Sequence, residues 1–84
     1  MNKVTIYSTP TCHYCAMAKE YFTANNVAYE NIDVTANNYE KVPELMDISG
    51  QQGVPVIVIG EGEKRQVIVG FDKPKVAAAL GLSQ

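Results

Sequence analysis

The sequence has no tryptophan, a single histidine and only two cysteines among its 84 residues. Two cysteines cannot build the multi-disulfide framework of a small secreted domain. Together with one histidine they also fall short of the four Cys or His ligands that a structural zinc ion usually takes. Seven basic residues face nine acidic ones, for a net charge of −2. Without a basic excess, we expect neither nucleic acid nor an anionic membrane surface as a partner.

Long apolar runs are also missing. No stretch approaches the length of a membrane span, and the N-terminus lacks the apolar core of a secretory signal. The sequence therefore predicts a cytoplasmic protein. Its length predicts one domain over residues 1–84, and the apolar fraction of 46% is enough for a small core. In a reducing compartment, a close cysteine pair favours catalysis or metal binding over a permanent disulfide.

The order of predicted elements is βαβαββα. Runs of β-branched and aromatic residues predict the strands, and apolar positions three and four residues apart predict the helices. Asn, Asp, Gly and Pro mark the expected ends of these elements. Each strand–helix–strand step should cross over right-handed, which gives a small four-stranded mixed sheet with helices on both faces, an α/β fold. The expected elements are strands at 3–7, 27–34, 54–59 and 65–69 and helices at 16–25, 39–49 and 72–80.

The two cysteines, Cys12 and Cys15, lie between the first strand and the first helix. Residues three apart share one face of a helix, so the two sulfurs can close into a disulfide or open to a dithiol. Cys12 falls at the helix start, where free backbone N–H groups and the helix dipole favour an anion. Thiolate is the nucleophilic form of cysteine. This pattern predicts a thiol–disulfide exchange site.

Pro55 opens the most strand-like run of the chain. A proline in this place belongs to the start or the edge of a strand. Two conformations fit the local sequence: a cis peptide after Val54 in a tight turn, or a trans proline that starts the strand. With the cis peptide, the backbone groups of Val54 would point outward and could pair with an extended substrate.

Three motifs far apart in the chain make it resemble the glutaredoxins. They are Cys12-His13-Tyr14-Cys15, Val54-Pro55 and Gly70-Phe71-Asp72. The resemblance covers nearly the whole chain, and it implies a thioredoxin-like fold and a dithiol oxidoreductase. Small glutaredoxin-like proteins that supply electrons to ribonucleotide reductase look similar too.

The resemblance also implies roles for individual residues. Cys12 would be the attacking thiolate and Cys15 the resolving thiol. Val54 and Pro55 would hold a glutathione or peptide strand, Tyr14 would flank the bound thiol, and Asp72 would grip the γ-glutamyl end of glutathione. The remaining residues expected to contact substrate are Thr11, His13, Gln51 and Phe71.

Three positions depart from the family pattern. His13 stands where proline is usual, Thr9 where many members have lysine, and Lys73 where a second aspartate is common. Losing a cation at one end of glutathione and an anion at the other should weaken its binding. A charge-assisted hydrogen bond contributes about 1.5–3 kcal/mol. A protonated His13, in contrast, would stabilise the Cys12 thiolate.

The expected function is reduction of protein disulfides or glutathione mixed disulfides, by a monomer with no bound cofactor or metal. Glutathione would be a co-substrate, and either glutathione or thioredoxin reductase would supply electrons. The alternatives are a thioredoxin-reductase-dependent donor of the ribonucleotide-reductase type and, less favoured, a metal or iron–sulfur carrier in which two chains share the metal. Asp72 and the tyrosines also have ordinary structural roles, as a helix cap and as packing.

Overall fold

A computed structural model describes residues 3–50, 53–60 and 65–81. Its elements are β1 (Val4–Ser8), α1 (His13–Ala24), β2 (Glu30–Asp33), α2 (Ala36–Tyr39), α3 (Val42–Ser49), β3 (Val56–Ile59), β4 (Gln66–Val69) and α4 (Lys73–Leu80). No helix within these ranges is long and apolar enough to cross a membrane.

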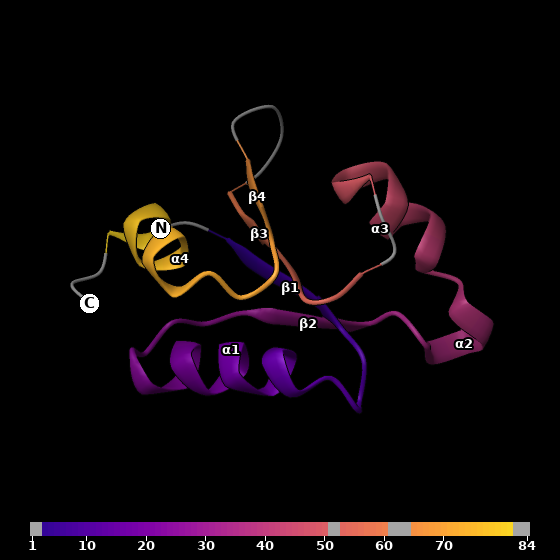
Figure 1. Cartoon of the computed structure of the whole chain (residues 1–84), viewed down its shortest axis with the longest axis horizontal. Coiled ribbons are helices and arrows are strands. Elements are labelled where there is room, and N and C mark those ends of the chain that lie inside the picture. The colour runs from indigo at the N-terminus through magenta and orange to yellow at the C-terminus, as the bar shows by residue number, and fades with distance from the viewer. Residues whose placement is uncertain (1–2, 51–52, 61–64, 82–84) are drawn as a thin grey trace.

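The four strands form one mixed sheet in the order β2-β1-β3-β4. β1 pairs with β2 in parallel, which requires a crossover through α1, whereas β1–β3 and β3–β4 are antiparallel. Figure 1 shows α4 and α3 on opposite sides of β3 and β4. The predicted α/β thioredoxin-like architecture, a four-stranded mixed sheet flanked by helices, is confirmed.

Two buried clusters fill the two sides of the sheet. Phe22 of α1 and Val76 of α4 pack with Ile6, Ile57 and Ile68 on one side. On the other side, Leu45 of α3 packs with inward residues of β1 and β3, namely Tyr7, Val56 and Val58. Burial of apolar surface at about 25 cal/mol per Å² stabilises both layers. Because α1 belongs to the first cluster, its N-terminal end is held against the end of β1.

Several predicted bounds were wrong by a few residues. α1 begins at His13 rather than at residue 16, β2 covers only four residues of the expected 27–34, and β3 begins at Val56 rather than at Val54. The shorter strands have a common reason, because they extend only as far as the neighbouring strand pairs with them. The turn predicted between the last two strands includes residues 61–63, which lie outside the described residues.

The helix expected over 39–49 begins three residues later than predicted, at Val42. Asn37 and Asn38 have left-handed backbone angles, with φ of 52° and 58°, instead of the extended backbone of a helix cap. α3 starts only at Val42, after Lys41, and no side chain caps it. Asparagine tolerates the left-handed region better than most residues, which explains this choice of conformation over a cap. Pro43 lies in the first turn of α3, as predicted.

Helix ends that depend on glycine or aspartate were predicted correctly. Gly50 ends α3 and Gly81 ends α4, both in the left-handed conformation that glycine adopts without steric cost. Asp72 caps α4, and its side chain accepts a hydrogen bond from the backbone N–H of Lys75 at 3.3 Å. α1 ends at Asn25, followed by Asn26 with a φ of 58°.

Candidate active site

The segments with the three motifs meet at one end of the sheet. β1 ends at Ser8, directly before the cysteine segment. Tyr7 of β1 pairs with Val56 of β3, which pairs in turn with Val69 of β4. The backbone N–H of Gly70 donates to the Pro55 carbonyl oxygen at 2.8 Å, which extends this ladder by one pair. The register therefore places the start of β3 and the end of β4 at the same end as the thiols.

Cys12 is the N-cap residue of α1. Its Sγ accepts a hydrogen bond from the Cys15 backbone N–H at 3.2 Å, the contact that an N-cap oxygen usually makes. The Cys12 backbone is fixed at both ends, because its N–H donates to the Thr9 carbonyl and its own carbonyl accepts from Ala16. A helix N-terminus favours negative charge on a group held there. The geometry suits a nucleophilic thiolate at Cys12, which is partly exposed.

Cys15 differs from Cys12 in its surroundings. It is fully buried beneath the first turn of α1. Burial, together with its side-chain contact to Cys12, raises the pKa of the Cys15 thiol to about 12. At neutral pH Cys15 is therefore a protonated thiol. Disulfide exchange requires one thiol that attacks and one that resolves the mixed disulfide. The accessible Cys12 sulfur matches the first role, and the buried, protonated Cys15 thiol matches the second.

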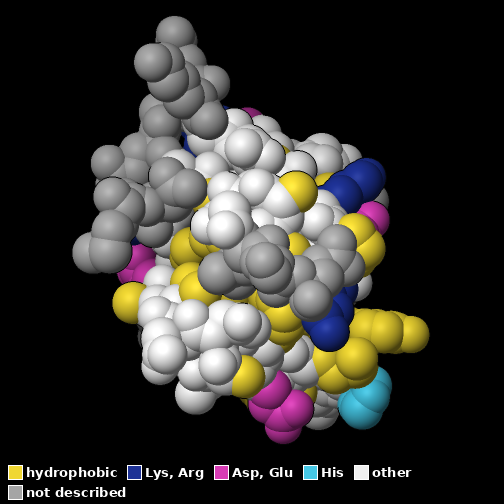
Figure 2. Space-filling view, turned by 90° about the vertical axis from the view of Figure 1, so that its left-hand side faces the viewer, with side chains coloured by type: hydrophobic (Ala, Val, Ile, Leu, Met, Phe, Trp, Pro, Cys, Tyr) yellow, Lys and Arg dark blue, Asp and Glu magenta, His cyan; other side chains and the backbone are white. Residues whose placement is uncertain are grey.

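The residues between the cysteines are exposed. The rings of His13 and Tyr14 meet edge to face, with their centroids 5.9 Å apart, and Tyr14 is 60% exposed. On the face shown in Figure 2, hydrophobic side chains gather beside the histidine, and a basic side chain lies next to them. Thr11 is exposed as well. The neighbours of the partly exposed Cys12 in the chain are therefore exposed side chains.

The peptide bond between Val54 and Pro55 is cis, which selects one of the two conformations left open by the sequence. Pro55 is buried and Val54 is half-buried. Within the described ranges, no residue forms a hydrogen bond with the Val54 backbone groups. Gln51, the other expected contact in this loop, lies outside the described residues.

Phe71 and Asp72 occupy the turn between β4 and α4. Asp72 caps α4 through one carboxylate oxygen, and its other oxygen lies 3.9 Å from the Lys75 ammonium in an exposed pair. Sequence reasoning missed this lysine, and it also missed the contact of Lys73 with Tyr21, whose ring centroid lies 5.6 Å from the Lys73 Nζ. The helical spacing of Asp72 and Lys75 was the available signal for the first contact. The second joins residues far apart in the chain.

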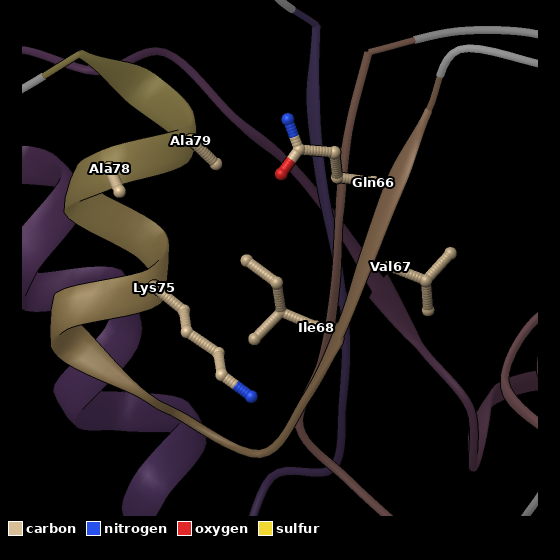
Figure 3. Close-up of a pocket in the computed structure, with 6 residues that line it drawn as sticks. All are labelled: Gln66, Val67, Ile68, Lys75, Ala78 and Ala79. Atoms are coloured by element: carbon tan, nitrogen blue, oxygen red, sulfur yellow. The ribbon is translucent and has the colours of Figure 1, made fainter.

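A hollow of about 380 Å³ lies elsewhere, between β4 and α4. Figure 3 shows the side chains of Gln66 and Lys75 extending into the space between the two elements. The other residues that line it are Val67, Ile68, Ala78 and Ala79. It contains none of the cysteine segment, so it is not part of the thiol site.

Comparison with known proteins decides what this arrangement is. The family model for glutaredoxin matches residues 4–63. The chain belongs to the glutaredoxin family. It is a thiol–disulfide oxidoreductase, in agreement with the paired thiols at the N-terminus of α1. Among the described residues, no group of three His, Cys, Asp or Glu side chains is placed to hold a metal ion.

Individual relatives agree with the family assignment. A glutaredoxin-like 8.6 kDa protein of Clostridium pasteurianum is 40% identical over 73 residues, which cover 87% of this chain and 91% of that protein. A glutaredoxin of Neisseria meningitidis is 45% identical over 62 residues, or 73% and 72% of the two chains. The crystal structure of an Archaeoglobus fulgidus glutaredoxin matches with a TM-score of 0.76 at 26% identity, covering 95% and 87%.

Proposed function

We propose that this glutaredoxin reduces disulfides of proteins, and mixed disulfides of proteins with glutathione, by a dithiol mechanism. The Cys12 thiolate attacks one sulfur of the substrate, forms a mixed disulfide and releases the other sulfur as a thiolate. Cys15 then loses its proton and attacks the Cys12 sulfur. The second substrate thiolate leaves, and the chain keeps a Cys12–Cys15 disulfide. Two electrons have passed from the pair to the substrate.

The observation that carries this proposal is the contrast between the two sulfurs. Cys12 is partly exposed at a helix N-cap with a backbone N–H donating to its sulfur, and Cys15 is buried and protonated. A protonated resolving thiol does not compete for the first attack, and it supplies the proton that the leaving thiolate takes up. The order of events follows from this difference.

The place of the Val54–Pro55 loop in the sheet supports a role for this loop in holding the substrate. The register places this loop at the thiol end of the sheet, and no described residue uses the Val54 backbone groups. An extended substrate could pair with them as an added strand. His13 and Tyr14 would then contact the substrate from α1, Thr11 from the segment before it, and Phe71 from the β4–α4 turn.

The source of electrons has two candidates, glutathione and thioredoxin reductase. Lys73 favours thioredoxin reductase, because it stands where a second carboxylate would otherwise meet a substrate ammonium. With that source, the chain would act as an electron donor of the ribonucleotide-reductase type. We place the activity in the cytoplasm, in a monomer with no bound cofactor.

The test is NADPH-coupled turnover of a small disulfide with two reducing systems. One contains glutathione and glutathione reductase, and the other contains thioredoxin reductase alone. We expect turnover with at least one system in the wild type and none in Cys12→Ser. Turnover with only one system identifies the reductant. Equal turnover by Cys12→Ser contradicts the mechanism. Purified protein that carries stoichiometric metal or colour, and shows no turnover, would favour the metal-carrier alternative.

A further inference from the structure

One side of α1 presents apolar residues from the cysteine pair along the helix. Tyr14, Met17 and Tyr21, called the α1 stripe from here on, are spaced by three and four residues and therefore share a face. Tyr14 is 60% and Met17 is 38% exposed, whereas Tyr21 is half-buried. The stripe starts between the two cysteines, so a molecule bonded to Cys12 lies at its beginning.

The far end of the α1 stripe is closed by the β4–α4 turn. The ring of Phe71 lies against that of Tyr21, with the centroids 5.8 Å apart. The ammonium of Lys73 stands over the same ring at 5.6 Å. A cation in this position is attracted by the face of the ring, which favours a position of the charge beside Tyr21. The stripe thus runs from a reactive sulfur to a positive charge.

The carboxylate next to Lys73 in the chain, that of Asp72, serves as the N-cap of α4 and forms an exposed pair with a different lysine. Asp72 is paired with Lys75 at 3.9 Å, and Lys73 has no ion-pair partner within the described ranges. The carboxylate at the α4 N-terminus is that of the N-cap residue Asp72, and the first turn that follows it contains no acidic residue. Glu20 lines a hollow with Lys19 and Thr23, on another side of α1. Lys73 therefore contributes a positive charge without an ion-pair partner in the described part of the chain at this end of the stripe.

The spacing of Cys12 and Tyr21 along α1 sets the approximate length of the ligand. Cys12 and Tyr21 are nine positions apart on α1, which is about 13 Å along the helix axis at 1.5 Å per residue. An extended chain advances about 3.3 Å per residue, so four residues span the same length. A single amino acid bonded to Cys12 does not reach Lys73, but a peptide segment does.

We propose that the α1 stripe and Lys73 bind an extended segment of a protein substrate that has an acidic residue about four positions from its reactive cysteine. Apolar residues between the two would lie on Met17 and Tyr21. The inference rests on the proposed function and specifies its substrate class. The exchange is the one given above: Cys12 bonds to the substrate cysteine, Cys15 replaces it, and the substrate leaves as the free thiol.

Peptide disulfides test this directly. Each probe is a pair of identical peptides joined through their cysteines, with alanine and valine as spacers and either Glu or Lys four positions from the cysteine. Two series place the charge on the N-terminal or on the C-terminal side. Excess pre-reduced protein gives a single turnover without any reductase, and released peptide is measured by chromatography after acid quenching. This makes the result independent of the electron source.

We expect the wild type to reduce the Glu peptide about two- to fivefold faster than the Lys peptide in one of the series, as for an exposed charge pair. The preference should shrink at high salt. Lys73→Glu should reverse it, and this variant should fold, because an acidic residue suits the first turn of a helix. Lys3→Glu makes the same change in net charge at the opposite end of β1 and should keep the wild-type preference.

Each outcome is decisive. Equal rates for both charges in both series, or a preference that Lys73→Glu leaves unchanged, overturn the inference while the proposed function stands. An equal effect of Lys3→Glu also overturns it, because overall charge rather than the stripe would then attract the peptide. A Glu peptide with the charge moved next to the cysteine should lose the preference. No reduction of any peptide by the wild type contradicts the proposed function itself.

Discussion

The buried state of Cys15 predicts a stability that falls at alkaline pH. An unfolded chain loses the Cys15 proton near the ordinary cysteine pKa of about 8.5. The folded chain keeps it until about pH 12, because burial raises the pKa of Cys15 to about 12. Between these values the unfolded state binds fewer protons, so the free energy of unfolding decreases as pH rises. Below about pH 8.5 Cys15 is protonated in both the folded and the unfolded state, so this group does not lower the free energy of unfolding there.

The size of the effect follows from linkage. Each pH unit inside this window corresponds to about 1.4 kcal/mol. From pH 8.5 to 10.5, wild type should therefore lose about 2 to 3 kcal/mol more than a Cys15→Ala variant, in which the group is missing. Tyr7, whose pKa is raised by burial and by its hydrogen bond to Glu44, is present in both proteins, so its contribution cancels.

Urea unfolding under reducing conditions, followed by circular dichroism at steps of half a pH unit, measures this difference. The test uses only the way in which the difference in free energy of unfolding between wild type and Cys15→Ala changes with pH. The substitution also alters packing, which adds a constant amount to this difference at every pH. A constant difference between the two proteins from pH 8 to 10.5 would refute the reasoning. Cys15 would then titrate like an ordinary thiol, and its role as the protonated partner of Cys12 would lose its physical basis.

Two further predictions concern the fold that positions the site. Phe22→Ala should lower the free energy of unfolding by about 3 to 5 kcal/mol, because Phe22 is fully buried between α1 and the sheet; a loss below 1 kcal/mol in urea titrations would contradict this packing. Asp72→Ala should cost about 1 kcal/mol through the lost cap of α4, and an unchanged melting temperature would show that the cap contributes nothing.

Much of the fold could be predicted because its signals are local. Cys15, Ala18 and Phe22 repeat at helical spacing, and they are the buried residues of α1. Gly50 and Gly81 end helices because their own backbone angles require it. The same reasoning failed at Asn37 and Asn38, since asparagine suits both a helix cap and a left-handed turn. The local sequence does not show whether such an asparagine caps a helix or forms a left-handed turn.

The site could be predicted only in part, for a similar reason. The two cysteines lie three positions apart in one short segment, so their spacing and their place before a helix indicate the chemistry. The contact of Lys73 with Tyr21 depends on how α4 packs against α1, and no short segment encodes it. The sequence marked Lys73 only as a departure from the family pattern. Because Lys73 lies at the end of the α1 stripe, we expect this departure to change which charge the site prefers in a substrate.

The most direct test of the account is the capture of the reaction intermediate. Cys15→Ser and Cys12→Ser are each incubated with a disulfide substrate, quenched with acid and measured by intact-protein mass spectrometry. We predict that Cys15→Ser accumulates a mixed disulfide at Cys12, because the resolving thiol is missing, and that Cys12→Ser accumulates none, because its remaining sulfur is buried and protonated. An adduct on Cys15 in Cys12→Ser at neutral pH, formed as fast as the adduct on Cys12, would contradict the assignment of the two roles.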